Sequence, residues 1–385
     1  MSNNGMKGIT GYFAEIEDPR HTKNRLHALI DVIVIGICAS TADCQTWEEI
    51  EDYARYKEEW LTTFLDLPNG IPSHDTFRRV FIQLDPKALL KAFLDWIEDV
   101  REHLGGTVIA IDGKTVRRNH DGYRKKKPLH LVSAWSVEHS LFLGQVAVGE
   151  KSNEIVAIPE LLEMLNLKGS IVTIDAMGCQ TNIAAKIVEK EGDYVLAVKD
   201  NQKSIHDQLK WFFNDVDLPA DLSEGGYIDH YQTFDKGHGR LETRQYLVSD
   251  EINFMDAELR GFANVRSIGM VECTRTIGNK KTKERRYYLS SLEPDAKLFA
   301  HAVRGHWAVE NSLHWVLDMT FREDESRMRA GHSPENMAIL RKIALMLVRR
   351  DIGSKKSLKR RRKIANYDDN YLQKLFLLPD PPPTS

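Results

Sequence analysis

Two short β-rich runs, each ending in an aspartate, constrain the fold of this sequence more than any other feature. Thr107–Ile111 leads into Asp112, and Ile171–Ile174 leads into Asp175. Three more β-rich runs and two stretches of helical periodicity surround them: strands over 129–137, 141–148 and 194–198, and helices over 153–166 and 181–190. The order β-β-β-α-β-α-β predicts a mixed α/β sheet, in which antiparallel strands are followed by parallel crossovers.

The rest of the chain divides by pattern. Residues 1–104 have helical periodicity, and residues 206–294 hold four polar, β-rich runs. Residues 295–350 return to helix, with segments over 296–319 and 337–350, and residues 351–385 contain seven basic residues within 355–363. We therefore predict an N-terminal helical domain, a sheet domain in two parts (105–205 and 295–350), an inserted β-rich subdomain between them and a basic C-terminal tail.

Charge and cysteine content exclude some classes of protein. The 385 residues include 53 basic and 56 acidic ones, a formal net charge of −3, which excludes a small, uniformly basic nucleic-acid binder but allows local basic surfaces. The four cysteines include no Cys-x-x-Cys pair, which argues against a zinc ribbon or a disulfide framework. Because the start lacks a signal-peptide pattern and the most hydrophobic run, Leu29–Ala39, is too short to span a bilayer, a soluble cytoplasmic protein is expected.

The two aspartates share a context in which functional groups gather, because the carboxyl ends of parallel strands meet at one edge of an open sheet. A single aspartate at a strand end is more often a turn former or a helix cap. A third acid, Glu310, lies in the long predicted helix over 296–319. Three converging carboxylates suit divalent cations, and two such ions promote phosphodiester displacement.

The helix around Glu310 also permits a zinc interpretation. His306, Glu310 and His314 are spaced at i, i+4 and i+8, roughly on one helical face. The spacing lacks two histidines four residues apart that share a zinc ion, and it leaves the aspartates unexplained. A further alternative is a helix that Trp307 and Trp315 pack into the core, with hydrogen-bonded histidines.

Basic residues follow Asp112 closely. Lys114, Arg117 and Arg118 lie within six residues of it, which suits a polyanionic substrate, although such a run is usually a solvated loop. The run over 355–363 is a second candidate phosphate contact, and its plainer interpretation is a solubilising tail.

A helix of the N-terminal domain carries two further candidates. Ser73 is a plausible N-cap, and Arg78 and Arg79 project from the helix that follows. A helix, a turn and an arginine-bearing helix are typical of a DNA-reading helix-turn-helix, and also of any small helical domain.

Five strings of the sequence occur in the order of a known family. They are IDGKTVRRN, TIDAMGCQ, VLAVKDNQ, KGHGRLETR and RGHWAVENSLHWVLDMTFREDESR. Over Gly11 to Arg350 the chain resembles the H-repeat-associated transposases, which are insertion-sequence transposases with a DDE triad on an RNase H-like fold. The resemblance implies that Asp112, Asp175 and Glu310 form the triad and that they bind Mg²⁺ (two ions per site, with Mn²⁺ as a substitute). Separately, we predict that the N-terminal helical domain binds the DNA ends.

One departure from this resemblance concerns the surroundings of Glu310. Related insertion-sequence transposases carry a Tyr, an Arg and a Lys at fixed distances from the glutamate. The corresponding residues here are Val303, His306 and Leu317. Arg304 and His306 are the candidates for the missing phosphate contact. Two further candidate DNA contacts are Lys199, after the strand over 194–198, and Trp307, which stacks on a displaced base or packs in the core.

The sequence therefore predicts a DNA transposase that cuts at the ends of its element and joins the freed 3′ ends to target DNA. The expected partners are double-stranded DNA, as terminal repeats and as target, and a second copy in a synaptic homodimer on the nucleoid. The alternatives are a metal-dependent nuclease of the same fold without strand transfer, and a DNA-binding protein whose acids are structural.

Overall fold

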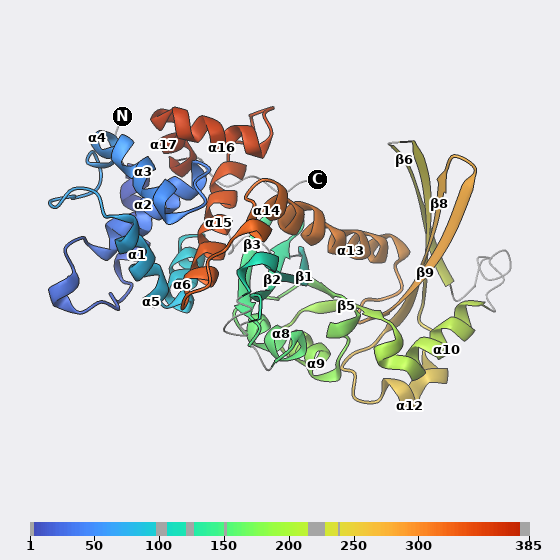
Figure 1. Ribbon diagram of the computed structural model, residues 1–385. Helices are drawn as coiled ribbons and strands as arrows, with labels where there is room; N and C mark the ends of the chain where they lie inside the picture. The colour runs from blue at the N-terminus through green and yellow to red at the C-terminus, as the bar shows by residue number, and fades with distance from the viewer. Residues whose placement is uncertain are drawn as a thin grey trace.

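A computed structural model describes residues 4–97, 106–120, 127–149, 152–214, 228–237 and 239–377, with the side chains of 4–8, 24 and 256 left aside. A helical region lies at one end, a sheet with helices on both sides lies in the middle, and tall antiparallel strands stand at the other end (Figure 1). Two features of the sequence fall outside the described residues: the predicted domain boundary at 104/105, and three further basic residues of the run after Asp112, namely Arg124, Lys125 and Lys126. Among the helices described, none is long and apolar enough to cross a membrane.

Within the described residues, nine strands form one mixed sheet in the order β3-β2-β1-β4-β5-β9-β8-β7-β6. Its first five strands are β1 (Val108–Thr115), β2 (His130–Ser136), β3 (Leu141–Ala147), β4 (Ile171–Ile174) and β5 (Asp193–Val198). The β1–β2 and β2–β3 pairs are antiparallel, whereas β1–β4 and β4–β5 are parallel. This is the RNase H-like arrangement, and it confirms the predicted strand order.

The β-rich insertion continues the same sheet. Its strands are β6 (Ile228–Gly237), β7 (Arg240–Ser249), β8 (Ser267–Ile277) and β9 (Lys280–Ser290). The join is antiparallel pairing of β9 with β5, from Val195↔Ser290 to Val198↔Tyr287. The helices η4 (Asp200–Gln202) and α10 (Lys203–Asn214) lie between β5 and β6, and η5 (Asn253–Met255) and α12 (Asp256–Leu259) lie between β7 and β8.

Helices cover both faces of the central strands. Val108, Ile171 and Val195 share a core with α13 (Ala296–Ala308), while the alternate strand residues join the core of α8 (Glu154–Glu163) and α9 (Thr181–Glu189). At Gly305 a Cβ would lie 3.0 Å from Val108 Cγ1 and 3.2 Å from Val137 Cγ2. The missing side chain therefore lets α13 approach β1 closely.

The predicted single helix over 296–319 is interrupted. A π-helical segment, η6 (Val309–His314), follows α13 and leads into α14 (Trp315–Met319) and the short turn η7 (Glu323–Glu325). Such segments insert one residue into the helical phase and are frequent at functional sites. Glu310 is the second residue of η6.

Both ends of the chain build the helical region. The N-terminal helices are α1 (Asn4–Ala14), η1 (Thr22–Asn24), α2 (Leu29–Thr41), α3 (Trp47–Tyr56), α4 (Glu58–Leu61), α5 (His74–Gln83) and α6 (Pro86–Trp96). The C-terminal helices that pack with them are α15 (Ser333–Arg349), α16 (Leu358–Tyr367) and α17 (Asp369–Leu377). In α2 and α15 nearly every residue is buried.

The basic C-terminal segment is predicted as a tail, but the structure folds most of it into α16 and α17. Arg362 lies in α16 with its side chain 1% exposed. Its guanidinium donates to the Ser40 carbonyl oxygen over 2.7 Å and pairs with Asp43 over 2.7 Å. These partners lie more than 300 residues earlier in the chain, so the local sequence shows only the charge.

Candidate active site

The two aspartates occupy equivalent positions on neighbouring parallel strands. The β1–β4 ladder ends at Ile111↔Ile174, so Asp112 and Asp175 are the next residue on each strand. β1 does not stop at Asp112 but continues to Thr115 against β2, with Asp112 opposite Ser133. Asp175 Oδ1 accepts a hydrogen bond from the Met177 N–H over 3.1 Å and caps the short turn η3 (Ala176–Gly178). The capping role considered for a strand-end aspartate is thus also present.

The parallel pairing of β1 with β4 brings the two aspartates close enough to interact electrostatically. His314 Nδ1 lies 3.3 Å from Asp112 Oδ2. Burial raises the pKa of Asp112, but the hydrogen bond and charge of His314 outweigh it, and the pKa is lowered. Burial and the negative charges of Glu154 and Asp112 raise the pKa of Asp175. The two strand ends therefore carry interacting carboxyl groups.

His306 connects Glu310 to this pair. Its Nδ1 lies 3.3 Å from Thr173 Oγ1 on β4. Burial lowers the pKa of His306, while the negative charges of Asp112, Asp175 and Glu310 oppose that shift. All three acids are thus near this imidazole. Glu310 itself is exposed, on the segment that follows α13.

The residue types at this site suit a hard divalent cation, but their side chains are not arranged as a complete set of metal ligands. Carboxylate oxygens are the ligands that Mg²⁺ prefers. Within the described part of the chain, however, no three His, Cys, Asp or Glu residues form a group able to hold a metal ion. This applies to the three carboxylates and to the zinc interpretation, whose histidines contact Thr173 and Asp112 instead.

Sequence reasoning missed a fourth acid, Glu154, at the start of α8. Its Oε1 lies 2.7 Å from His130 Nε2, and His130 Nδ1 lies 2.7 Å from Thr115 Oγ1. A Cβ at Gly113, the residue after Asp112, would overlap the Glu154 carboxylate. An acid in the first turn of a helix is ordinary, so nothing in the sequence singles out Glu154. Only the fold brings it close to Asp175 and to Gly113, the residue after Asp112.

The basic residues after Asp112 separate in the structure. The Lys114 side chain, 11% exposed, places its Nζ 2.5 Å from both Asp318 Oδ1 and Glu323 Oε2. Lys114 is therefore committed to an internal ion pair, which differs from the predicted phosphate contact. The remaining candidates, Arg117 and Arg118 in η2 (Arg117–Asn119) and Lys199 after β5, are exposed.

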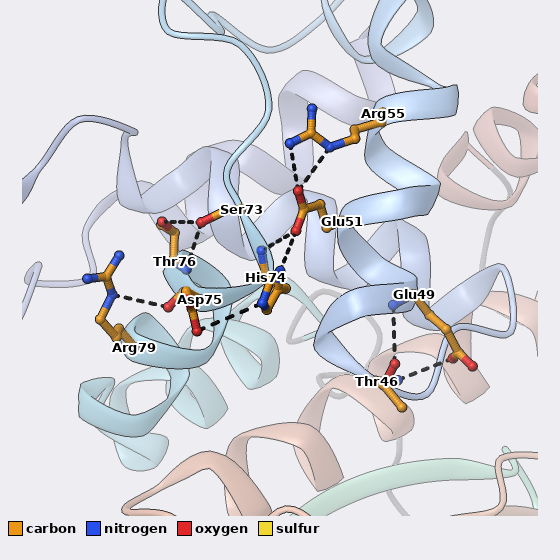
Figure 2. A network of polar contacts seen from close by, with 9 residues as sticks. All are labelled: Thr46, Glu49, Glu51, Arg55, Ser73, His74, Asp75, Thr76 and Arg79. Carbon is orange, nitrogen blue, oxygen red and sulfur yellow. Dashed lines mark hydrogen bonds and ion pairs between the residues drawn. The ribbon is translucent and has the colours of Figure 1, made fainter.

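The N-terminal arginines lie on α5 as predicted. Ser73 Oγ accepts from the Thr76 N–H and caps the helix (Figure 2). Arg78 and Arg79 are both exposed, and Arg79 Nε donates to the Asp75 carbonyl oxygen over 3.2 Å (Figure 2). Arg78 lines a groove of about 690 Å³, together with Arg327 and residues at the start of α3.

Trp307 and Arg304 lie at the junction of α13 with the insertion. The Trp307 ring is half-buried, with guanidinium groups of Arg244, Arg286 and Arg304 over it. The indole is thus held in a cationic setting rather than packed in a purely apolar core.

Comparison with known proteins defines the class. The chain matches the family described as "Transposase DDE domain" over residues 103–347, and the one described as "DDE_Tnp_1-associated" over residues 10–97. The chain therefore belongs to the transposase DDE domain family, which confirms the family predicted from the sequence.

Individual relatives agree with this class. The chain is 40% identical to "Putative transposase YncI" of Escherichia coli O157:H7, over 96% of this chain and 95% of the relative. It is 38% identical to "H repeat-associated putative transposase YhhI" of Escherichia coli K12, over 95% and 97%. A piggyBac transposase synaptic complex with hairpin DNA aligns at a TM-score of 0.42 and 14% identity, over 98% of this chain and 80% of that one.

Proposed function

We propose that this protein cleaves DNA at the ends of an insertion element and transfers the freed 3′ ends to target DNA. The observation that carries the proposal is the equivalent placement of Asp112 and Asp175 on adjacent parallel strands, with Glu310 on a helix packed across β1. Membership in the transposase DDE domain family supports the same chemistry.

The proposed roles follow from the contacts. Asp112, Asp175 and Glu310 are the ligands for Mg²⁺, which supplies activation of the attacking oxygen and charge neutralisation at phosphorus. His314 holds the Asp112 carboxylate in place through its 3.3 Å contact. His306, half-buried and 3.3 Å from Thr173 of β4, holds the helix against the strand ends.

The proposed partners are double-stranded DNA, as element ends and as target, and a second copy of the chain. Two DNA ends must be held together for joint transfer, which favours a homodimer assembled on DNA. A protein with these partners works on the nucleoid in the cytoplasm. Arg117, Arg118 and Lys199 are exposed and are the proposed contacts for phosphates near the site, although Arg117 already pairs with Asp324 over 3.3 Å.

The test uses full-length protein, Mg²⁺ and a labelled duplex from the DNA flanking the gene. Asp112→Asn, Asp175→Asn and Glu310→Gln should each lower cleavage and strand transfer at least ~100-fold, because the metal is needed for both steps, while duplex binding remains. Glu325→Gln is the control, since Glu325 is an exposed acid bonded to Arg322.

Wild-type rates in any of the three variants would remove that residue from the proposed site. Cleavage by the unaltered protein without strand transfer would favour the nuclease alternative. Duplex binding with no metal-dependent cleavage would favour a DNA-binding protein with structural acids.

A further inference from the structure

Three guanidinium groups surround one indole ring beside the candidate active site. The distances from the guanidinium carbon to the Trp307 ring centroid are 5.3 Å for Arg244, 5.2 Å for Arg286 and 5.3 Å for Arg304. Cation–π attraction holds a guanidinium against an aromatic ring at such distances. It does not remove the mutual repulsion of three positive charges.

The strand register explains how residues far apart in sequence meet here. Arg244 on β7 pairs with Cys273 on β8, and Arg286 on β9 pairs with Val271 on β8. Positions 271 and 273 of β8 point to the same face, because side chains alternate along a strand. Both arginines therefore face α13, which carries Arg304 and Trp307.

Acidic residues neutralise only part of this charge. Arg244 pairs with both Asp235 and Glu242, and Arg286 Nε donates to Glu284 over 2.8 Å. The contact of Arg304 with Asp235 is long, at 3.9 Å. Arg240 and Arg275 also pair with Glu242. Among the described residues, five arginines thus share three paired carboxylates, and one positive charge remains in excess when the nearby Glu310 is counted as well.

Donor groups also remain unused. Arg244 is 4% exposed, and its Nε has no hydrogen-bond partner within the part of the chain that the structure describes. Arg304 is exposed. A buried guanidinium N–H without an acceptor is costly unless a ligand completes it. The missing acceptor and the excess positive charge both indicate an anion.

This cluster adjoins Glu310. Trp307 precedes Glu310 by three residues, across the join between α13 and η6. Burial lowers the pKa of Arg286, but its hydrogen bond to Glu284 and the negative charges nearby, with a smaller contribution from Glu310, outweigh this and raise it. An anion held by these arginines would therefore lie next to the proposed catalytic carboxylate.

We propose that Arg244, Arg286 and Arg304, held around the Trp307 ring, bind backbone phosphates of the DNA strand that reaches Glu310. The proposal rests on the proposed function, since DNA is taken as the substrate. Guanidinium groups suit phosphate because their planar donors match its oxygens. The cluster supplies, from the insertion and α13, phosphate contacts that His306 and Leu317 do not provide beside Glu310.

The test measures DNA binding without catalysis. Full-length protein in EDTA is titrated with a fluorescein-labelled duplex at several salt concentrations, and the slope of log affinity against log salt is compared. Arg286→Gln combined with Arg304→Gln should reduce the slope by about 0.9 for each phosphate that the variant no longer neutralises. Arg266→Gln is the matched control, an exposed arginine before β8 that pairs with Glu293 outside the cluster.

A double variant with the wild-type slope, or a control that reduces the slope equally, would overturn the proposal. Thermal melting confirms that each variant is folded, and Arg304→Gln alone, at an exposed position, provides the same reading if the double variant unfolds. Trp307→Phe should retain the slope and Trp307→Leu should reduce it, because only an aromatic ring positions the guanidinium groups. A wild-type slope for Trp307→Leu would contradict the proposal that the Trp307 ring positions the guanidinium groups.

Failure of this proposal is distinguishable from failure of the proposed function. A reduced slope in the cluster variants together with wild-type cleavage by the triad variants would retain the phosphate site and reject the assigned acids. An unchanged slope together with inactive triad variants would reject the phosphate site alone.

Discussion

Replacing Lys114 tests whether this lysine holds the fold together or contacts DNA. The sequence places it two residues after Asp112 in a basic run, which predicts a phosphate contact. In the structure it joins β1 to the segment after the Glu310 helix, through Asp318 and Glu323. Lys114→Met removes the charge and keeps most of the side-chain volume, so the ion pair is the main quantity changed.

The cost follows from the burial of Glu323, whose side chain is 1% exposed. Burial raises the pKa of Glu323, but the charges of Lys114, Lys342 and Arg341 outweigh it and lower the pKa from 4.5 to about 2. At about 1.4 kcal/mol per pH unit, this difference corresponds to roughly 3 kcal/mol of folding free energy. Removing one partner of a buried ion pair costs about 3–5 kcal/mol. Because Arg341 and Lys342 remain, we expect the lower end, about 3 kcal/mol.

Urea unfolding at neutral pH measures this cost, and a duplex-binding titration follows under conditions in which the variant is folded. Lys114→Met should lose about 3 kcal/mol of stability and bind DNA with the wild-type salt dependence. The double variant Lys114→Met with Glu323→Gln should recover only part of the loss, because it removes the unpaired carboxylate but leaves the buried Arg341 and Lys342 without their negative partner. Arg117→Met is the control for stability, because its side chain is 82% exposed; as a proposed phosphate contact, it should lower the salt dependence of DNA binding without unfolding the protein.

The pH dependence has a definite sign. Glu323 has a depressed pKa in the folded state, so its contribution is complete above pH 4.5 and is lost as the pH falls toward about 2. Glu323→Gln should flatten acid unfolding over that window. A Lys114→Met variant that keeps its stability to within about 0.5 kcal/mol but loses DNA affinity would refute this reasoning and restore the phosphate contact.

Three further predictions concern other parts of the chain. Glu154→Gln should lower Mg²⁺-dependent cleavage at least ~10-fold with duplex binding unchanged, because this carboxylate lies against the strand that carries Asp112; unchanged cleavage would leave Glu154 a purely structural acid. Arg362→Ala should cost about 3 kcal/mol in urea unfolding, because it removes a buried guanidinium and its pair with Asp43; a DNA-binding defect in a fully stable protein would contradict this. Arg78→Ala with Arg79→Ala should weaken binding to terminal repeats more than to random duplex, by about 1–3 kcal/mol for each arginine that reads a base, and equal losses would indicate phosphate contacts.

The central sheet could be predicted because its evidence is local. β-branched runs, an intervening three-residue turn and alternating helical stretches give the strand order, and β4 has the predicted bounds, Ile171–Ile174. The end of β1 differs because strand pairing overrides the turn signal. The Asp112-Gly113-Lys114 sequence reads as a turn, yet β2 continues the ladder to Thr115↔His130.

The surroundings of the site could not be predicted, because their partners are distant in sequence. Lys114 and Glu323 are separated by 209 residues, and Arg362 and Ser40 by 322. From composition alone, charged residues such as Lys114 and Arg362 are expected to be exposed at the surface. Only tertiary packing shows which charge is paired, as for Lys114, and which keeps an excess, as in the arginine cluster around Trp307.

The same packing ties the N-terminal domain to the active-site helix through α15. At one end of α15, Asn336 Nδ2 donates to the Phe81 and Leu84 carbonyl oxygens, over 2.9 and 2.8 Å, at the end of α5. At the other end, Arg349 Nη2 donates to the Ser312 carbonyl oxygen in η6 over 2.6 Å. One buried helix thus spans from the helix that carries Arg78 to the segment that carries Glu310. Because buried helices resist bending and sliding, a duplex bound by α5 would meet Glu310 at a distance set by the fold rather than by a flexible linker.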